Sequence, residues 1–148
     1  MNNQQFMTEA HLESELAAHG TCFTRTRGTS MKPLLKENRD AVVLKIPDRE
    51  IRKYDVVLYK DSFGRYILHR VIAIKGDVLV IRGDNTYKKE LVPKSEILAV
   101  MVSYNRKGKS RSIDCFGYKL YSRVWNFLYP LRHIARKPFA LVKKILKK

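Results

Sequence analysis

The stretch RYILHRVIAIKGDVLVIRGDN, residues 65–85, decides how the rest of the chain is interpreted. It holds two runs, 65–74 and 77–82, that are rich in β-branched residues and are separated by a short turn at Lys75-Gly76. Runs of this composition on either side of a glycine-containing turn are typical of paired antiparallel strands. The stretch therefore predicts a β-hairpin, which ends in a turn at Gly83-Asp84-Asn85.

Further segments on both sides of this hairpin have the same strand-like composition and are bounded by Pro, Asp, Gly or Asn. These segments are residues 21–27, 41–46, 55–60 and 96–105. A short helix is expected over residues 8–18, where Leu12 and Leu16 share one face. Short strands joined by short turns predict a mainly β fold, in the form of an antiparallel barrel-like or sandwiched domain.

The composition changes again after Gly117. From Lys119 to Lys148 the chain has nine basic residues and no acidic residue, and its apolar residues recur at helical spacing. We therefore expect three parts: an N-terminal helix (1–20), a β-domain (21–116) and a tail of basic amphipathic helices (117–148).

Two roles are open for this tail. Residues 138–148 combine apolar and lysine side chains, which predicts docking on an anionic membrane surface without spanning it. The alternative is that Trp125, Leu128 and Leu131 pack on the β-domain and that only the last lysines are solvated. A division between the two, with 118–136 packed and 138–148 on lipid, is also consistent with the pattern.

The whole-chain composition limits the class of protein. A chain of 148 residues is about one domain, and its net charge of +16 indicates an anionic partner or a solvated basic tail. Cys22 and Cys115 lie far apart, so we expect reduced thiols and neither a disulfide framework, a metal site nor a cofactor. The polar N-terminus and the lack of a run of ~18 apolar residues predict a cytoplasmic protein without signal peptide or transmembrane segment.

The candidate catalytic residues are Ser30, His69 and Asp84. Ser30 lies in the turn RGTSMKP, between a glycine and a proline that exclude regular structure. Strand alternation places the His69 ring among apolar neighbours, and the hairpin brings it towards Asp84. A serine becomes nucleophilic when a histidine removes its proton, and a third group holds the imidazole in one tautomer. Each residue also has an ordinary interpretation, as a loop serine, a core histidine and a turn aspartate.

Four short sequence boxes resemble those of the type I signal peptidase and LexA-like serine peptidase superfamily, in that family's order. They are Ser30-Met31-Lys32-Pro33, Asp55-Val56-Val57-Leu58-Tyr59, His69-Arg70-Val71 and Gly83-Asp84-Asn85. The similarity covers residues 21–102. The histidine in the third box is similar to the endoplasmic-reticulum and archaeal enzymes, whereas the bacterial membrane enzymes have lysine there.

The resemblance implies a coiled β-barrel catalytic domain and a serine endopeptidase that cuts a leader or signal-like segment from a peptide or protein. Ser30 would be the nucleophile, His69 the base and Asp84 the orienting group. Met31 would line the substrate groove, and the backbone near Gly28 would help to bind the oxyanion. The chain departs from the family because it lacks membrane anchors, and because Lys88 and Lys89 precede Glu90 where a second acidic residue is common.

Two other functions remain open. The first is a self-cleaving domain of the LexA type, although only 29 residues precede Ser30 and the chain has no Ala-Gly dipeptide, the bond that such repressors usually cut. The second is a non-catalytic basic β-domain that binds nucleic acid or anionic lipid. No array of aromatic residues is spaced as a stacking platform for bases, so no specific nucleic acid is expected.

Overall fold

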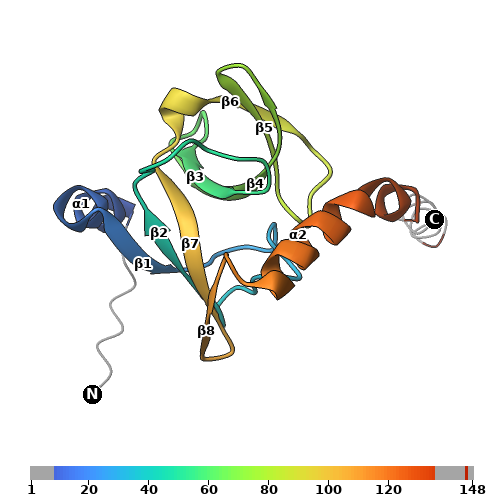
Figure 1. Ribbon diagram of the computed structural model, residues 1–148, viewed down its shortest axis with the longest axis horizontal. Helices are drawn as coiled ribbons and strands as arrows, with labels where there is room; N and C mark the ends of the chain where they lie inside the picture. The colour runs from blue at the N-terminus through green and yellow to red at the C-terminus, as the bar shows by residue number, and fades with distance from the viewer. Residues whose placement is uncertain (1–8, 136–145, 147–148) are drawn as a thin grey trace.

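The computed structural model describes residues 9–135 and Leu146. Its helices and strands are arranged around a single antiparallel sheet (Figure 1). In chain order the elements are α1 (Glu9–His19), β1 (Thr21–Arg25), β2 (Ala41–Lys45), β3 (Val56–Lys60), β4 (Tyr66–Lys75), β5 (Val78–Arg82), β6 (Glu90–Pro93), η1 (Lys94–Glu96), β7 (Ala99–Arg106), β8 (Lys109–Ser112) and α2 (Phe116–Phe127).

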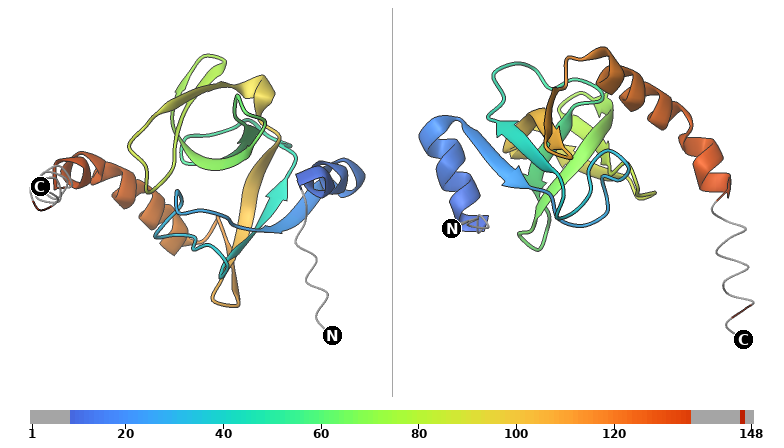
Figure 2. Two further views of the ribbon diagram at one scale, coloured as in Figure 1. Left: turned by 180° about the vertical axis from the view of Figure 1, so that it is seen from behind. Right: turned by 90° about the horizontal axis from the view of Figure 1, so that it is seen from below.

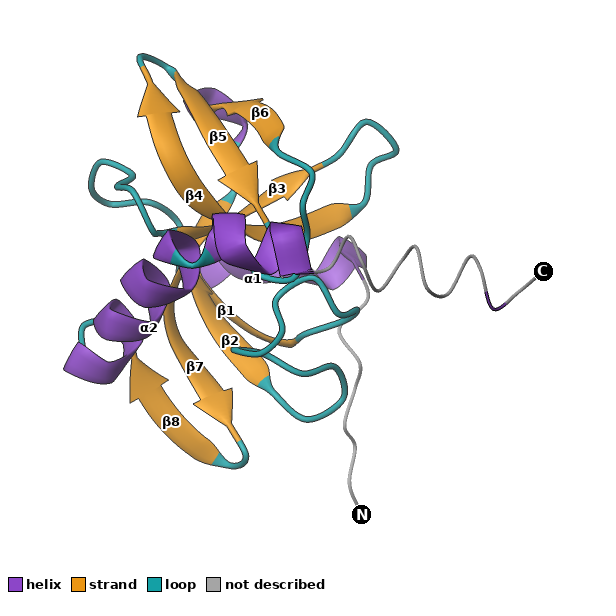
Figure 3. Ribbon diagram, turned by 90° about the vertical axis from the view of Figure 1, so that its right-hand side faces the viewer, coloured by secondary structure: helices purple, strands orange, loops and turns teal. Residues whose placement is uncertain are grey.

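The mainly β prediction is confirmed, but within the residues that the structure describes the strands do not close into the coiled β-barrel that the resemblance implies. The strands follow the open order β1-β2-β7-β3-β4-β5-β6, with β8 added to β7. β1 and β6 are therefore the ends of an open path. The sheet is bent, so that β4, β5 and β6 lie at one end of the molecule and β8 lies at the other (Figure 3).

The predicted hairpin forms as β4 and β5. Lys75 is paired with Val78, and Gly76 in the turn has a φ of +61°, in the left-handed region that glycine adopts at little cost. Arg70 is paired with Arg82, so the residues after β5 return beside His69. This register places the Gly83-Asp84-Asn85 turn close to His69, the predicted general base.

Two apolar clusters fill the two sides of the bent sheet. One includes Leu12 and Leu16 of α1 together with Met31 and residues of β2 and β7. The other lies inside the curl made by β3, β4, β5 and β6, and Val57 and Val71 are completely buried there. His69 is on the same face of β4 as Val71, which places its ring at the margin of the second cluster.

The part of the basic tail that the structure describes packs on the β-domain. α1 and α2 lie on opposite sides of the β-domain (Figure 2). Tyr118 and Ser122 are buried, and the indole N–H of Trp125 donates to the carbonyl oxygen of Asp84 at 2.8 Å. Leu131, however, is exposed, contrary to the packing alternative. The segment 138–148 falls outside the described residues except for Leu146, so its membrane contact stays a prediction.

No helix in the described part of the chain is long and apolar enough to cross a membrane.

Candidate active site

Ser30 lies in the loop between β1 and β2 and is half buried. The loop begins at Gly28, whose φ of +76° turns the chain away from the strand direction. At its far end, the buried Asp40 carboxylate accepts hydrogen bonds from the Lys36 N–H (2.8 Å) and from the Arg39 guanidinium (2.7 Å). These bonds hold the loop in place, so the position of Ser30 is set at both ends.

The Gly83-Asp84-Asn85 turn holds the main chain at Ser30. The Asn85 N–H donates to the Ser30 carbonyl oxygen at 2.8 Å. The Asn85 side-chain amide donates to the Thr29 carbonyl oxygen at 3.1 Å. The fourth sequence box and the box that contains Ser30 are thus connected directly, although 54 positions separate Ser30 from Asp84 in the chain.

His69 approaches the same place from β4. A Cβ atom added to Gly83 would lie 2.7 Å from the Ser30 carbonyl oxygen and 3.0 Å from Nε2 of His69. The ring nitrogen and the serine main chain therefore meet around Gly83, where a side chain has no room. No hydrogen bond joins the Ser30 hydroxyl to the ring within residues 9–135. Catalytic hydrogen bonds are often long in a free enzyme and tighten when substrate binds.

The other ring nitrogen of His69 faces a tyrosine and a glutamate. Nδ1 lies 3.4 Å from the hydroxyl oxygen of Tyr59, and that hydroxyl donates to Oε2 of Glu90. Tyr59 is on β3 and Glu90 is on β6. In the sheet, β4 and β5 lie between these two strands. The curl of the sheet brings them together, and the Tyr59 side chain is almost fully buried.

This arrangement favours one tautomer of the ring. Because the Tyr59 hydroxyl donates its hydrogen bond to Glu90, its oxygen is free to accept a hydrogen bond from Nδ1. Nδ1 then carries the hydrogen, and Nε2, which faces Ser30, is left with the lone pair that a general base needs. Burial, followed by the hydrogen bond to Glu90, raises the pKa of Tyr59, so the phenol stays protonated at neutral pH.

The ring itself is neutral at physiological pH. Burial lowers the pKa of His69 below its ordinary value, because the protonated ring loses hydration. The negative charges of Glu90 and Asp84 oppose this effect and offset only part of it. Neutral imidazole is the form that accepts a proton from serine.

Asp84 makes its hydrogen bonds elsewhere. Its two carboxylate oxygens accept from Nε and Nη2 of Arg70 at 2.8 and 2.9 Å, and the Tyr121 hydroxyl donates to it at 2.8 Å. Its expected role as the group that orients His69 is therefore not supported by a hydrogen bond between the two side chains. It affects the ring through its charge, whereas Tyr59 contacts the ring nitrogen.

Arg70 connects this site to α2. Its side chain is completely buried, and its Nη1 donates to the hydroxyls of Tyr118 (3.1 Å) and Ser122 (3.0 Å). Burial is the largest influence and opposes the charge on Arg70, but the charge and hydrogen bonds of Asp84, together with Tyr118 and Tyr121, outweigh it and raise the pKa of the guanidinium. The buried pair of Arg70 and Asp84 attaches α2 to the turn that holds Ser30.

A pocket opens beside Ser30 and His69. It is a cavity of about 200 Å³ between the end of β1, the Ser30 loop and the start of β4. Gly28 and Met31, both expected near the substrate, line it. Its other lining residues are Leu12, Thr24, Arg25, Thr26, Arg27, Leu35, Val42, Leu44, Leu58, Tyr66, Ile67 and Leu68. The lining is mostly apolar and includes no acidic residue.

Backbone donors are available next to the nucleophile. In the part of the chain that the structure describes, the N–H groups of Gly28 and Ser30 make no hydrogen bond. Unpaired N–H groups beside a nucleophile can stabilise the negative charge of a tetrahedral intermediate. Ser30, His69 and two backbone donors are thus gathered at one end of an apolar pocket.

Tyr59 and Glu90 were not identified from the sequence as site residues. Val57 is paired with His69, so Tyr59, two residues further along β3, projects from the same face and is diagonal to the ring. That parity would have identified Tyr59. Glu90 begins the short strand β6, which the sequence did not predict, and no local pattern indicated its contact with Tyr59.

No protein-family model matches the chain, and no curated protein matches it significantly.

Proposed function

We propose that the protein is a serine endopeptidase of the signal-peptidase type, which cuts a leader or signal-like segment from a peptide or protein. The observation that carries this proposal is the meeting of Nε2 of His69 with the Ser30 loop at Gly83, beside an apolar pocket. The order of the four sequence boxes supports it. We also propose that the bent sheet is an open variant of the fold of that superfamily.

In the proposed reaction, the Ser30 hydroxyl oxygen attacks the carbonyl carbon of the substrate peptide bond while Nε2 of His69 takes its proton. The carbonyl oxygen becomes negatively charged and accepts hydrogen bonds from the N–H groups of Ser30 and Gly28. Collapse of this intermediate breaks the C–N bond, and the imidazolium gives its proton to the leaving amine. Water then hydrolyses the serine ester by the same steps, with His69 again acting as the base.

The ring position in this mechanism depends on Tyr59 and Glu90. When Nε2 takes a proton, the ring becomes an imidazolium, and the carboxylate of Glu90 offsets the new positive charge through the Tyr59 hydroxyl. Tyr59 and Glu90 would thus take the part that the sequence resemblance gives to Asp84. Asp84 would act mainly by holding Arg70 and α2 against the turn.

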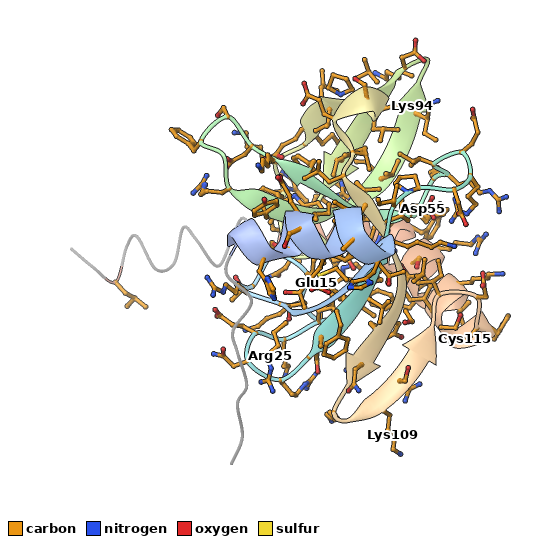
Figure 4. The ribbon with its side chains drawn as sticks, turned by 90° about the vertical axis from the view of Figure 1, so that its left-hand side faces the viewer. Glu15, Arg25, Asp55, Lys94, Lys109 and Cys115 are labelled. Carbon is orange, nitrogen blue, oxygen red and sulfur yellow. The ribbon has the colours of Figure 1, made fainter. Side chains whose placement is uncertain are left out.

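The pocket also constrains the substrate. Its apolar floor, which includes Leu44 and Leu58, suits an apolar side chain next to the scissile bond. Arg25 and Arg27 line the pocket, are exposed and form no ion pair within the described residues. Arg25 lies at the end of β1 (Figure 4). We propose that they favour substrates with an acidic residue near the cleavage site.

The test of the proposal is covalent labelling with a fluorophosphonate, together with cleavage of a proteome-derived peptide library. We expect labelling at Ser30 and cleavage that both disappear in Ser30→Ala, while that variant keeps the unfolding temperature of the wild type. Ser110→Ala, in the exposed strand β8, is the matched control and should keep both. If the folded wild type shows neither labelling nor cleavage, the non-catalytic binding domain is the better description. Cleavage of the chain itself alone would favour the self-cleaving domain.

The location and the tail complete the proposal. We propose that the protein acts on the cytoplasmic side and that residues 138–148 contact an anionic membrane surface peripherally. The basic composition of that segment supports the contact.

A further inference from the structure

The outward face of α2 and of the helical residues after it carries a row of exposed apolar side chains. Phe127 is 81% exposed and Leu131 is 64% exposed, although both are large and apolar. We call this row the outward stripe, and it consists of Phe116, Leu120, Val124, Phe127, Leu131 and Ile134. Soluble monomers seldom leave so many large apolar side chains in one row, so the row marks an interaction surface.

The stripe runs from α2 onto a second helical segment, residues 129–135, which follows α2 after a turn at Leu128. Residues 129–135 are helical, and the Leu128 N–H donates to the Val124 carbonyl oxygen at 3.0 Å. The Arg132 N–H in turn donates to the Leu128 carbonyl oxygen at 3.0 Å. Successive members of the stripe are three or four residues apart, which is the spacing that puts side chains on one face of a helix.

The helix cannot roll to bury this face. Its opposite face is fixed by Tyr118, Tyr121 and Trp125, which make hydrogen bonds to Arg70 and Asp84. Arg132 also donates to the Asp84 carbonyl oxygen at 3.0 Å. The stripe therefore points away from the β-domain because of bonds made to buried groups, and α2 lies along the outside of the molecule (Figure 2).

The charges beside the stripe indicate what covers it. Lys119 and Arg123 are exposed and lie along one side of the stripe in the helical projection. No acidic residue occurs from Lys119 to the end of the chain, and the whole chain has a net charge of +16. A helix with an apolar face flanked by basic residues is typical of segments that lie in the headgroup region of anionic membranes.

We infer that the outward stripe docks the folded protein on an anionic lipid bilayer. The apolar side chains enter the boundary between headgroups and acyl chains, and Lys119 and Arg123 meet the lipid phosphates. This surface is distinct from residues 138–148, and the inference does not depend on peptidase activity. It assigns the principal membrane contact to the packed helix, to which the contact proposed for residues 138–148 is secondary.

Vesicle co-sedimentation of the full chain tests this inference. The vesicles are phosphatidylcholine with or without phosphatidylglycerol, at low salt. The stripe variant Leu120→Gln/Phe127→Gln is compared with the control Phe63→Gln/Leu91→Gln, which removes a phenylalanine and a leucine that are at least as exposed, elsewhere on the surface. A third variant, Leu141→Gln/Ile145→Gln, tests the end of the chain. Circular dichroism establishes that each variant folds.

We expect the wild type, the control and the third variant to bind vesicles that contain phosphatidylglycerol. The stripe variant should partition at least about tenfold less, because two large side chains no longer leave water. Three results would overturn the inference: no binding of the wild type to anionic vesicles, equal binding of the stripe variant, or loss of binding in the third variant alone. Dimerisation without lipid that the stripe variant abolishes would also overturn it, in favour of a second copy of the chain.

Discussion

The hydroxyl of Tyr59 lies 3.4 Å from Nδ1 of His69, across the neighbouring strands β3 and β4. The same hydroxyl donates its proton to Glu90, so its oxygen is available to the ring. A serine base needs its proton on Nδ1 and its lone pair on Nε2. In the proposed mechanism, this contact places the proton on Nδ1 and leaves Nε2 free to act on Ser30.

Tyr59→Phe should lower kcat by about 10- to 100-fold and change KM little, because the ring loses the group that fixes its tautomer. The change removes one oxygen and keeps the aromatic packing. The matched control is Tyr104→Phe, which removes a hydroxyl from a tyrosine buried in the other apolar cluster. Steady-state kinetics on one cleaved peptide measures both. Equal activity of the two variants would show that Tyr59 has no positioning role.

The activity should persist to lower pH than an ordinary histidine allows. Neutral His69 is the active form, so the rate rises as pH increases through its pKa. Burial lowers that pKa, and we therefore expect the rising limb of kcat/KM below about pH 6.5. Glu90→Gln removes a charge that raises the pKa of His69. The rising limb of kcat/KM against pH should therefore lie at still lower pH in this variant. A limb that stays in place in Glu90→Gln, or that moves to higher pH, would contradict this assignment.

Gly83→Ala should inactivate the enzyme by pushing Ser30 and His69 apart. The new methyl group would lie 2.7 Å from the Ser30 carbonyl oxygen, which is backbone and cannot move away easily. We expect a loss of about 100-fold or more in kcat and of about 1–3 kcal/mol in the free energy of unfolding. Gly117→Ala is the control, since a Cβ there meets no atom within 4 Å and the residue lies in α2. It should keep activity and gain about 0.5–1 kcal/mol in stability.

Much of the fold followed from residue patterns, while the parts that were missed depend on contacts across the sheet. The β4–β5 hairpin and α1 were predicted because β-branched runs, the turn at Gly76 and the spacing of Leu12 and Leu16 are local signals. β8 was missed because KSRS has no apolar residue, and all four of its side chains are exposed. Its pairing with β7 comes from the tight turn and not from burial.

The candidate site shows the same limit. The order of the sequence boxes led to the prediction that Ser30 and His69 act together. Both residues line one pocket in the structure, and their catalytic roles stay predictions. Arg70 is next to His69 on its strand, so strand alternation places its side chain on the opposite face. This side chain is fully buried, because α2 covers that face and Asp84 compensates its charge. Such a pairing depends on a helix that begins 46 positions later, which local periodicity cannot indicate.

Asp84→Asn should act mainly on stability. The substitution leaves the buried Arg70 without its counter-charge, so we expect the free energy of unfolding to fall by about 3–5 kcal/mol. The double variant Arg70→Met/Asp84→Leu removes both charges and should be less destabilised than either single variant. Chemical denaturation measures all of them. If Asp84→Asn keeps its stability but loses kcat at a temperature where it is folded, Asp84 is the orienting group after all.

The last prediction concerns the two arginines at the pocket. Arg25 and Arg27 alternate with Thr24 and Thr26 along the end of β1, and all four residues line the cavity. The lining includes no carboxylate that could pair with the arginines. An acidic side chain of a bound peptide would therefore supply the negative charge that the pocket lacks. Cleavage sites recovered from the peptide library should therefore be enriched in Asp and Glu near the scissile bond.

Charge reversal separates this preference from a general effect of the basic chain. Arg25→Glu/Arg27→Glu should reverse the enrichment, so that Lys and Arg become favoured near the cleavage site, with at least about a tenfold change in the ratio of kcat/KM for acidic and basic versions of one peptide. Arg106→Glu/Arg111→Glu, which makes the same change in net charge on β7 and β8, is the matched control and should leave the ratio as in the wild type. Added salt should weaken the preference, because exposed charges are screened. A wild type that cuts peptides without acidic enrichment, or a control that shifts the ratio equally, would show that the arginines do not select the substrate.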